Sequence, residues 1–323
     1  MNNTKKVLVC GSISYDTIMV FKDKFKNHIL PEELDILNLA FHVPELRREY
    51  GGTAANICYN MHLLNCNGVP VATVGNDFKD YSGRFSQLNI SQDYIKVIDG
   101  EVTPQDYITT DLDNNQIAAF HPGALDSSHK NSITNFDNVF MGLISPDGLE
   151  GMELHAEQFY KESIPFLFDP GQVTPLLDAE QLISFITKAN WAIFNAYEWK
   201  VFNEKTKLSH EEVKELLDVH IVTEGGKGAI IYLKDQTINI PVAKVSHDAD
   251  PTGCGDAFRS GVVYGLLNNL DWKTAGEVAS LMGAYSYESK GSQNHNFNIS
   301  NFYDRFKLNY GENKVLKRHL LDE

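Results

Sequence analysis

Short apolar runs recur along the chain, each bounded by glycine or polar residues. The runs that predict buried strands are "VLVCG" at 7–11, "VATVG" at 71–75, "VFMGLIS" at 139–145, "FLFD" at 166–169, "WAIFNA" at 191–196 and "IVTEG" at 221–225. Segments with helical period lie between most of them, among them "TAANICYNMHLLN" and "HEEVKELLD". This alternation predicts an α/β fold, with a mostly parallel central sheet flanked by helices on both faces.

Two regions depart from the alternation. "TIMVF" and "LNLAFHV" follow the first strand without a convincing helix between them, and "QDYITTD" and "QIAAF" flank a hairpin turn at Asp113 and Asn114. We expect these four strands to form a small separate sheet that acts as a lid over the ligand site. The lid would come from insertions at about 16–50 and 100–122 in a single α/β domain that spans residues 1–323.

The net charge of the chain limits the kinds of molecule that it is expected to bind. Lys and Arg total 28 against 43 Asp and Glu, which gives a formal net charge of −15. Nucleic acids and anionic membranes bind basic surfaces, so we expect neither as a partner. A small-molecule substrate fits this composition better.

Cysteine spacing and the N-terminus bear on location. The four cysteines stand singly, without CxxC pairs or zinc-ligand spacing, which predicts reduced thiols. "MNNTKK" leads directly into a short apolar run that suits a buried strand better than a secretory signal. No apolar stretch approaches the roughly 18 residues of a membrane helix. These features predict a cytoplasmic protein.

The candidate chemistry begins at "HDADPTGCGDAFRSG", residues 247–261, where two glycines and a carboxylate precede a predicted helix. A helix N-terminus has unpaired N–H groups and a partial positive charge, so it stabilises a bound phosphate. Asp256 would then be suited to take a proton from a hydroxyl that attacks a phosphoryl group. By itself this position is better explained by an aspartate that caps a helix.

The string "DPTGCGDAF" resembles the D-T-x-G-A-G-D-x-F signature of the ribokinase-like sugar and nucleoside kinases, the PfkB family. Several further motifs in the same order extend the resemblance over essentially the whole chain. It implies transfer of a phosphoryl group from ATP with Mg²⁺. It also implies that the amides of Gly253, Cys254 and Gly255 form the anion hole and that Asp256 is the catalytic base. Cys254 replaces the usual alanine, a change between small residues that keeps the N–H group.

Two motifs are candidates for the acceptor site. "GGTAAN" opens a helix and matches the family's Gly-Gly-x-x-x-Asn, which implies that Gly51, Gly52 and Asn56 bind sugar hydroxyls. "GSISYD" follows the first strand, and a carboxylate at the carboxyl end of a parallel strand faces the ligand crevice. Asp16 is therefore expected to bind a vicinal diol. Ser12 stands where the family usually has asparagine, so the resemblance implies a weaker substrate contact at Ser12.

Two further motifs are candidates for the nucleotide site. "NAYE" matches the family's Asn-x-x-Glu, which implies that Asn195 and Glu198 organise Mg²⁺ and phosphate, with Glu198 acting indirectly. "IVTEGGKGA" lacks the G-x-x-x-x-G-K-[ST] pattern of a P-loop. It resembles the family's V-T-x-G-x-x-G instead, so Thr223, Gly225 and Gly228 are nucleotide candidates.

The resemblance suggests an adenine pocket and a cation site near the end of the chain. "GAYSYESKGSQNH", 283–295, predicts the end of a helix at Gly291. In the family this region and the loop from Asp250 to Thr252 shape the adenine pocket. A monovalent cation, K⁺, often binds there to backbone carbonyls. Thr252 is thus a nucleotide candidate and Asp250 a candidate neighbour of K⁺.

The acceptor is less firmly indicated than the reaction. Phe41, Tyr107, Phe120 and His121 in the expected lid are suited to stack on a purine, although each also suits the core of the small sheet. The segments around "GGTAANICYN" and "TTDLDNNQIAAFHPGA" resemble bacterial adenosine kinase-like members. Together they predict a purine nucleoside kinase that acts on adenosine.

Three alternatives remain. A ribokinase- or fructokinase-type sugar kinase would use the same machinery, and a non-catalytic nucleoside or nucleotide sensor would have no need of Asp256. A dinucleotide-dependent oxidoreductase is disfavoured, because no G-x-G-x-x-G follows the first strand. Family members occur both as monomers and as dimers joined through the lid, so the sequence leaves a monomer and a homodimer open.

Overall fold

The computed structural model describes residues 5–29, 39–113 and 115–321. In this part of the chain the main sheet has the strand order β13-β12-β11-β10-β9-β8-β1-β4-β5. The parallel strands are β1 (Lys6–Cys10), β4 (Asn67–Val74), β5 (Tyr94–Val97), β8 (Val139–Ile144), β9 (Phe166–Phe168), β10 (Trp191–Asn195) and β11 (Val219–Thr223). β12 (Ala229–Leu233) and β13 (Thr237–Ile240) add an antiparallel edge. All of the predicted main-sheet strands are present, and the predicted α/β fold is confirmed.

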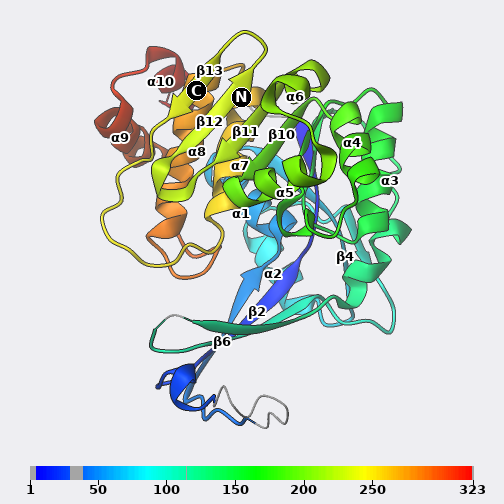
Figure 1. Cartoon of the computed structure of the whole chain (residues 1–323), viewed down its shortest axis with the longest axis vertical. Coiled ribbons are helices and arrows are strands. Elements are labelled where there is room, and N and C mark those ends of the chain that lie inside the picture. The colour runs from blue at the N-terminus through cyan, green and yellow to red at the C-terminus, as the bar shows by residue number, and fades with distance from the viewer. Residues whose placement is uncertain (1–4, 30–38, 114, 322–323) are drawn as a thin grey trace.

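Helices cover both faces of this sheet, as predicted (Figure 1). Side chains along a strand alternate between faces, so Val7 and Val9 of β1 join one hydrophobic core and Leu8 and Cys10 the other. The first core packs against α1 (Thr53–Leu63), α2 (Lys79–Gln87), α7 (Cys254–Leu267), α8 (Trp272–Tyr287), α9 (Ile299–Tyr310) and α10 (Lys314–Leu321). The second packs against α3 (Leu149–Lys161), α4 (Ala179–Lys188), α5 (Ala196–Thr206) and α6 (His210–Leu216).

A second, smaller sheet projects from the lower end of the molecule in Figure 1. Its order is β3-β2-β6-β7, formed by β2 (Ser14–Val20), β3 (Glu45–Gly51), β6 (Gln105–Thr110) and β7 (Gln116–His121). β6 and β7 are the expected hairpin, whose predicted turn residue Asn114 lies outside the described residues. The expected small sheet is therefore present.

One of its strands lies elsewhere than expected. The apolar run at 37–43 predicts a strand, but residues 39–43 form none, and 30–38 lie outside the described residues. The strand is β3, "ELRREYG", which pairs antiparallel with β2. Charged side chains on its exposed face hide the apolar alternation by which a strand is recognised. Phe41 instead packs against Phe21 and Phe25, with ring centroids 4.8 and 5.1 Å apart.

The helix before residue 295 also ends earlier than predicted. α8 ends at Tyr287, and Gly291 lies in the following loop with φ of 82°. Within the described residues, no helix combines the length and apolar character needed to cross a membrane.

Candidate active site

The first turn of α7 is open to bind an anion. Gly253 precedes the helix with φ of 82°, and a Cβ there would lie 2.6 Å from Cβ of Ser292, so only glycine fits. In the described residues, the N–H groups of Gly255 and Asp256 have no backbone partner. Such orphan N–H groups, together with the helix dipole, favour a negative group at this turn.

Asp256 lies in the same turn and faces α1. Its Oδ2 accepts a hydrogen bond of 2.8 Å from Nδ2 of Asn56. Burial raises the pKa of Asp256 to about 7, although the nearby Arg259 and the Asn56 bond both lower it. A carboxyl group with this pKa can take up a proton near neutral pH.

The side chain of Asn56 is held from its other side. Its Oδ1 accepts hydrogen bonds of 2.9 Å from Ser292 Oγ and from Gln293 Nε2. Because both donors approach the oxygen, the amide nitrogen must face Asp256. The loop after α8 thus fixes the orientation of Asn56, a contact that the sequence motifs did not predict.

Asp16 lies near this pair, but not where the sequence argument placed it. It belongs to β2 of the small sheet rather than to the carboxyl end of β1, because β1 ends at Cys10 and a loop separates the two strands. Ser14 Oγ donates to Asp16 Oδ1 over 3.2 Å. Burial, with a contribution from Asp106, raises the pKa of Asp16 to about 6.

Two glycines at the start of α1 leave room for these groups. A Cβ at Gly51 would lie 2.4 Å from Asp16 Oδ2, so Gly51 supports Asp16 from behind. Gly52 has φ of 92°, and a Cβ there would lie 2.6 Å from the carbonyl oxygen of Ser12. Ser12 Oγ accepts from the Thr53 N–H over 3.0 Å. Ser12 therefore stabilises the first turn of α1.

Asn195 and Glu198 form a capping box at the start of α5. Asn195 Oδ1 accepts from the Glu198 N–H over 2.8 Å, and Glu198 Oε2 accepts from the Asn195 N–H over 2.7 Å. Glu198 Oε1 also accepts from Asn195 Nδ2 over 2.6 Å. Burial raises the pKa of Glu198, with the charge of Arg259 opposing that rise.

A single cavity of about 890 Å³ brings most of the predicted residues together. Those that line it are Ser12, Asp16, Gly52, Asn56, Phe120, Asn195, Glu198, Thr223, Gly225, Thr252, Gly253, Gly255 and Asp256. They come from both sheets and from the first turns of α1, α5 and α7. Segments far apart in the sequence therefore meet at one site, as their motif order predicts.

Four predicted residues do not line this cavity: Gly51, Gly228, Asp250 and Cys254. Gly228 closes the turn before β12, where its Cβ would lie 2.0 Å from the Ile240 carbonyl oxygen. Asp250 accepts from the N–H groups of Thr252 and Gly291 over 2.9 and 3.1 Å and so ties two loops together. Burial raises the pKa of the Cys254 thiol to about 11, which makes its thiolate scarce at neutral pH.

The cavity also contains carboxylates that no motif predicted, namely Asp106, Asp126, Asp147 and Asp169. Burial raises the pKa of Asp147 to about 8. Asp147 and Asp169 follow closely after β8 and β9. A carboxylate that follows a parallel strand was a usable signal, since ligands bind at the carboxyl ends of such strands.

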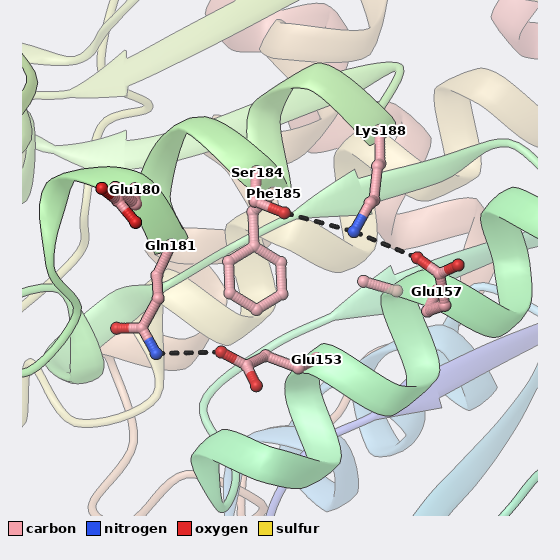
Figure 2. A pocket seen from close by; sticks show the side chains of 8 residues that line it. Glu153, Glu157, Glu180, Gln181, Ser184, Phe185 and Lys188 are labelled. Carbon is pink, nitrogen blue, oxygen red and sulfur yellow. Dashed lines mark hydrogen bonds and ion pairs between the residues drawn. The ribbon is translucent and has the colours of Figure 1, made fainter.

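A second cavity, of about 410 Å³, lies between α3 and α4. Figure 2 shows its polar side chains paired across the groove: Gln181 donates to Glu153 over 2.9 Å, and Lys188 lies 3.1 Å from Glu157. None of the predicted site residues lines it.

The large, mostly parallel sheet, the smaller sheet beside it and the open helix start next to a buried carboxyl group are the arrangement expected of a ribokinase-like phosphotransferase. A family model described as pfkB family carbohydrate kinase matches residues 5–298. The chain therefore belongs to the PfkB family, and it is a phosphotransferase with an alcohol group as acceptor.

Relatives of this chain include proteins named nucleoside kinase. One from Methanocaldococcus jannaschii is 31% identical over 258 residues, which cover 79% of this chain and 85% of the relative. The solved structure of a Burkholderia thailandensis nucleoside kinase in complex with inosine has a TM-score of 0.87 at 41% identity, covering 95% of this chain and 98% of that one. A Thermotoga maritima ribokinase shares the fold, with a TM-score of 0.78 at 20% identity, covering 93% of this chain and 99% of that one.

Proposed function

We propose that the protein is a nucleoside kinase that transfers the γ-phosphoryl group of Mg-ATP to the 5′-hydroxyl of a purine nucleoside, with adenosine as its preferred acceptor. The observation that carries this proposal is the cavity in which the open turn of α7, Asp256 and the acceptor candidates Asp16 and Asn56 meet. The likeness to a nucleoside kinase of 41% identity supports a nucleoside as the acceptor.

The charge of the cavity favours an uncharged acceptor. Its described lining contains the carboxylates of Asp16, Asp106, Asp126, Asp147, Asp169, Glu198 and Asp256, but only one cationic side chain, Arg259. A sugar phosphate would meet repulsion from these carboxylates, whereas a nucleoside or free sugar would not. Arg47 and Arg48 of β3, the arginines nearest Gly51 in the sequence, do not line the cavity.

The acceptor is held by polar groups at one end and stacked at the other. Asp16 offers two oxygens to a vicinal diol, and the N–H of Asn56 that Asp256 does not use is free to bind a ribose oxygen. Gly52 lines the same cavity, and its missing Cβ lets the backbone of Ser12 pack closely against the start of α1. Phe120 is 55% exposed although it lines the cavity, so its ring is available to stack on a purine.

The transfer step uses Asp256 and the first turn of α7. The 5′-oxygen attacks the γ-phosphorus, and its proton passes to a carboxylate oxygen of Asp256. The bond from phosphorus to the bridging oxygen of the β-phosphate breaks, and ADP leaves. The unpaired N–H groups of Gly255 and Asp256 in this turn stabilise the charge on the transferred group, whereas the N–H of Cys254 already donates to the carbonyl oxygen of Pro251.

The described residues fit a magnesium ion that is carried by the nucleotide. They contain no cluster of three or more potential metal ligands, and both oxygens of Glu198 already accept hydrogen bonds from Asn195. Mg²⁺ commonly keeps several waters and is bound through substrate phosphates, so Glu198 would contact its waters. When bound, the ion offsets negative charge on the phosphates.

The nucleotide would lie along Thr223, Gly225 and Thr252, which line the end of the cavity formed by β11, the turn after it and the loop before α7. A K⁺ site beside Asp250 stays a prediction of the family resemblance. We place this reaction in the cytoplasm, where it would salvage purine nucleosides as nucleotides.

An acceptor panel tests the proposal. ADP release from Mg-ATP would be measured with adenosine, inosine, guanosine, cytidine, ribose, fructose and fructose 6-phosphate. We expect the highest kcat/KM with a purine nucleoside, adenosine above the others, and no turnover with fructose 6-phosphate. Preference for a free sugar would overturn the nucleoside proposal, and a lack of turnover with every acceptor would favour a sensor.

A further inference from the structure

Arg259 is the one cationic side chain in the described lining of a strongly acidic cavity. It lies on α7, one turn after Asp256, and it is only 7% exposed. Neither the helix-start motif nor the other motifs of the sequence assign it a role. A buried guanidinium always carries its charge, so it contributes to the electrostatics of the site at any working pH.

Asp169 fixes the guanidinium through two of its nitrogens. Nη2 donates to Asp169 Oδ1, and Nε faces Asp169 Oδ2. Asp169 follows β9 directly and is itself 1% exposed, so both partners are rigidly placed. The third nitrogen, Nη1, forms no hydrogen bond with another described residue.

Nη1 lies beside the anion-binding turn. A Cβ at Gly255 would lie 2.6 Å from it, so Gly255 is needed for the guanidinium to reach this place. Gly255 and Arg259 both line the cavity. An unpaired, nearly buried N–H donor therefore stands next to the unpaired backbone N–H groups of the same helix turn.

We propose that Arg259 is a further phosphate-binding residue of this kinase, whose Nη1 donates to an oxygen of the phosphoryl group in transfer. The backbone of the α7 turn binds that group as a dipole, and Arg259 adds a full positive charge on the same side. The interaction strengthens as the bond to ADP breaks and negative charge grows on the oxygens of the leaving and transferred groups. Asp169 is a positioning residue that aims the guanidinium.

The alternative is a purely structural ion pair that fastens α7 to the end of β9. Both roles predict that removing Arg259 destabilises the fold, because Asp169 would be left as an unpaired buried charge. The two differ in turnover by folded protein. The proposal rests on phosphoryl transfer at this cavity, and it does not depend on which acceptor is used.

The test compares Arg259→Lys, Arg259→Ala and Asp169→Asn with the wild type. Arg259→Lys keeps a positive charge beside Asp169 but loses the planar guanidinium with its third nitrogen. We expect this variant to fold, with kcat reduced about 100-fold and little change in KM for the acceptor. Added guanidinium should restore part of the activity of Arg259→Ala, whereas methylammonium should not. Asp169→Asn should lower kcat while leaving KM for the acceptor unchanged.

Arg305→Lys is the matched control. Arg305 also forms a two-nitrogen ion pair, at 2.7 and 2.8 Å from the oxygens of Glu288, but it does not line the cavity. Its variant is expected to retain kcat. Folded Arg259→Lys with kcat within about threefold of wild type, or folded Arg259→Ala that guanidinium does not rescue, would overturn the proposal. Wild type that phosphorylates only sugars would overturn the nucleoside assignment alone, and the Arg259 comparison would then be made on that sugar.

Discussion

Asp256 and Asn56 show how single residues set the chemistry of this site. Asp256 is surrounded by protein, which favours its protonated form, while the N–H of Asn56 and the charge of Arg259 favour the carboxylate. The balance places its pKa at about 7. In the proposed mechanism Asp256 must be ionised to accept a proton, so this balance would set the fraction of active enzyme near neutral pH.

This balance predicts the pH dependence of catalysis. Below about pH 7 the free enzyme holds Asp256 protonated, so kcat/KM should rise about tenfold per pH unit and level off above pH 7. Asn56→Leu removes a donor that lowers the pKa of Asp256, so the acidic limb should move to higher pH. Steady-state kcat/KM measured across pH for wild type and for Asn56→Leu tests the profile and its shift. A limb centred below pH 5, or one that Asn56→Leu leaves in place, would contradict this assignment.

Residues differed in how far the sequence could predict them. Asp16, Asn56 and Asp256 belong to compact motifs, and the cavity contains all three. Gly228, Asp250 and Cys254 belong to such motifs too, yet they do not line the cavity, because Gly228 faces the Ile240 carbonyl oxygen and Asp250 ties two loops together. Arg259 and Asp169 are 90 residues apart, and only the fold shows that they pair.

At the scale of elements, α5, α6, β11 and β12 meet in an aromatic stack outside the cavity. Trp199 and His210 have ring centroids 4.0 Å apart, and His220 stacks on Tyr232 at 4.6 Å. His210 Nδ1 and His220 Nε2 lie 2.8 Å apart, so one of these two nitrogens carries a proton and donates it in a hydrogen bond to the other. Burial, together with the neighbouring His210 and Lys214, lowers the pKa of His220 to about 3.

This stack predicts that stability declines in mild acid. The unfolded chain protonates His220 below about pH 6.5, whereas the folded protein does not until about pH 3, so the unfolded state binds more protons between those values. As the pH is lowered through this range, protonation of His220 in the unfolded chain should reduce the free energy of unfolding by up to about 1.4 kcal/mol per pH unit.

Urea unfolding at pH 7 and pH 5 measures the effect. The difference in unfolding free energy between wild type and His220→Gln should shrink by about 2 kcal/mol between these two pH values. His319→Gln, at an exposed position on α10, serves as the control. An equal pH dependence in wild type and His220→Gln would contradict the assignment.

Element prediction succeeded where burial is strongest. The central parallel strands β1, β4 and β8 are buried on both faces, so they appear as continuous apolar runs that stand out from helical segments, whereas the half-exposed edge strand β5 gave no such run. β3 carries mostly charged residues at its exposed positions, and β12 and β13 are only partly buried, so these strands gave no clear apolar signal. The capping box of Asn195 and Glu198 at the start of α5 was not predicted, because the same two residues matched a ligand-site motif.

At the scale of the whole molecule, the cavity is enclosed by two sheets that serve different purposes. The main sheet and its helices carry Asp256, Glu198 and Arg259, whereas the small sheet contributes Asp16, Asp106 and Phe120. All positions of β7 are exposed. A sheet with so little burial of its own is suited to move, and its closure over a nucleoside would exclude water from the transferred phosphoryl group.

Hydrogen exchange tests this closure. Saturating adenosine should slow amide exchange in β2, β6 and β7, because closure shields these strands and restrains their opening. Ribose, which lacks a base for Phe120 to contact, should give less protection. The β12 and β13 hairpin is an internal control, since neither strand lines the cavity. Unchanged exchange in all three lid strands, with adenosine shown to be bound, would contradict the closure.

The central claim is that this cavity directs the γ-phosphoryl group to the 5′-hydroxyl of a nucleoside with Asp256 as the base. The most direct test identifies the product of adenosine and Mg-ATP by phosphorus NMR, for wild type and for Asp256→Asn. We predict ADP and the nucleoside 5′-monophosphate in equal amounts, with turnover reduced by about 10²- to 10⁴-fold in Asp256→Asn, which should fold and bind ATP as the wild type does. A phosphate on the 2′- or 3′-hydroxyl, inorganic phosphate alone, or near-normal turnover by Asp256→Asn would contradict the account.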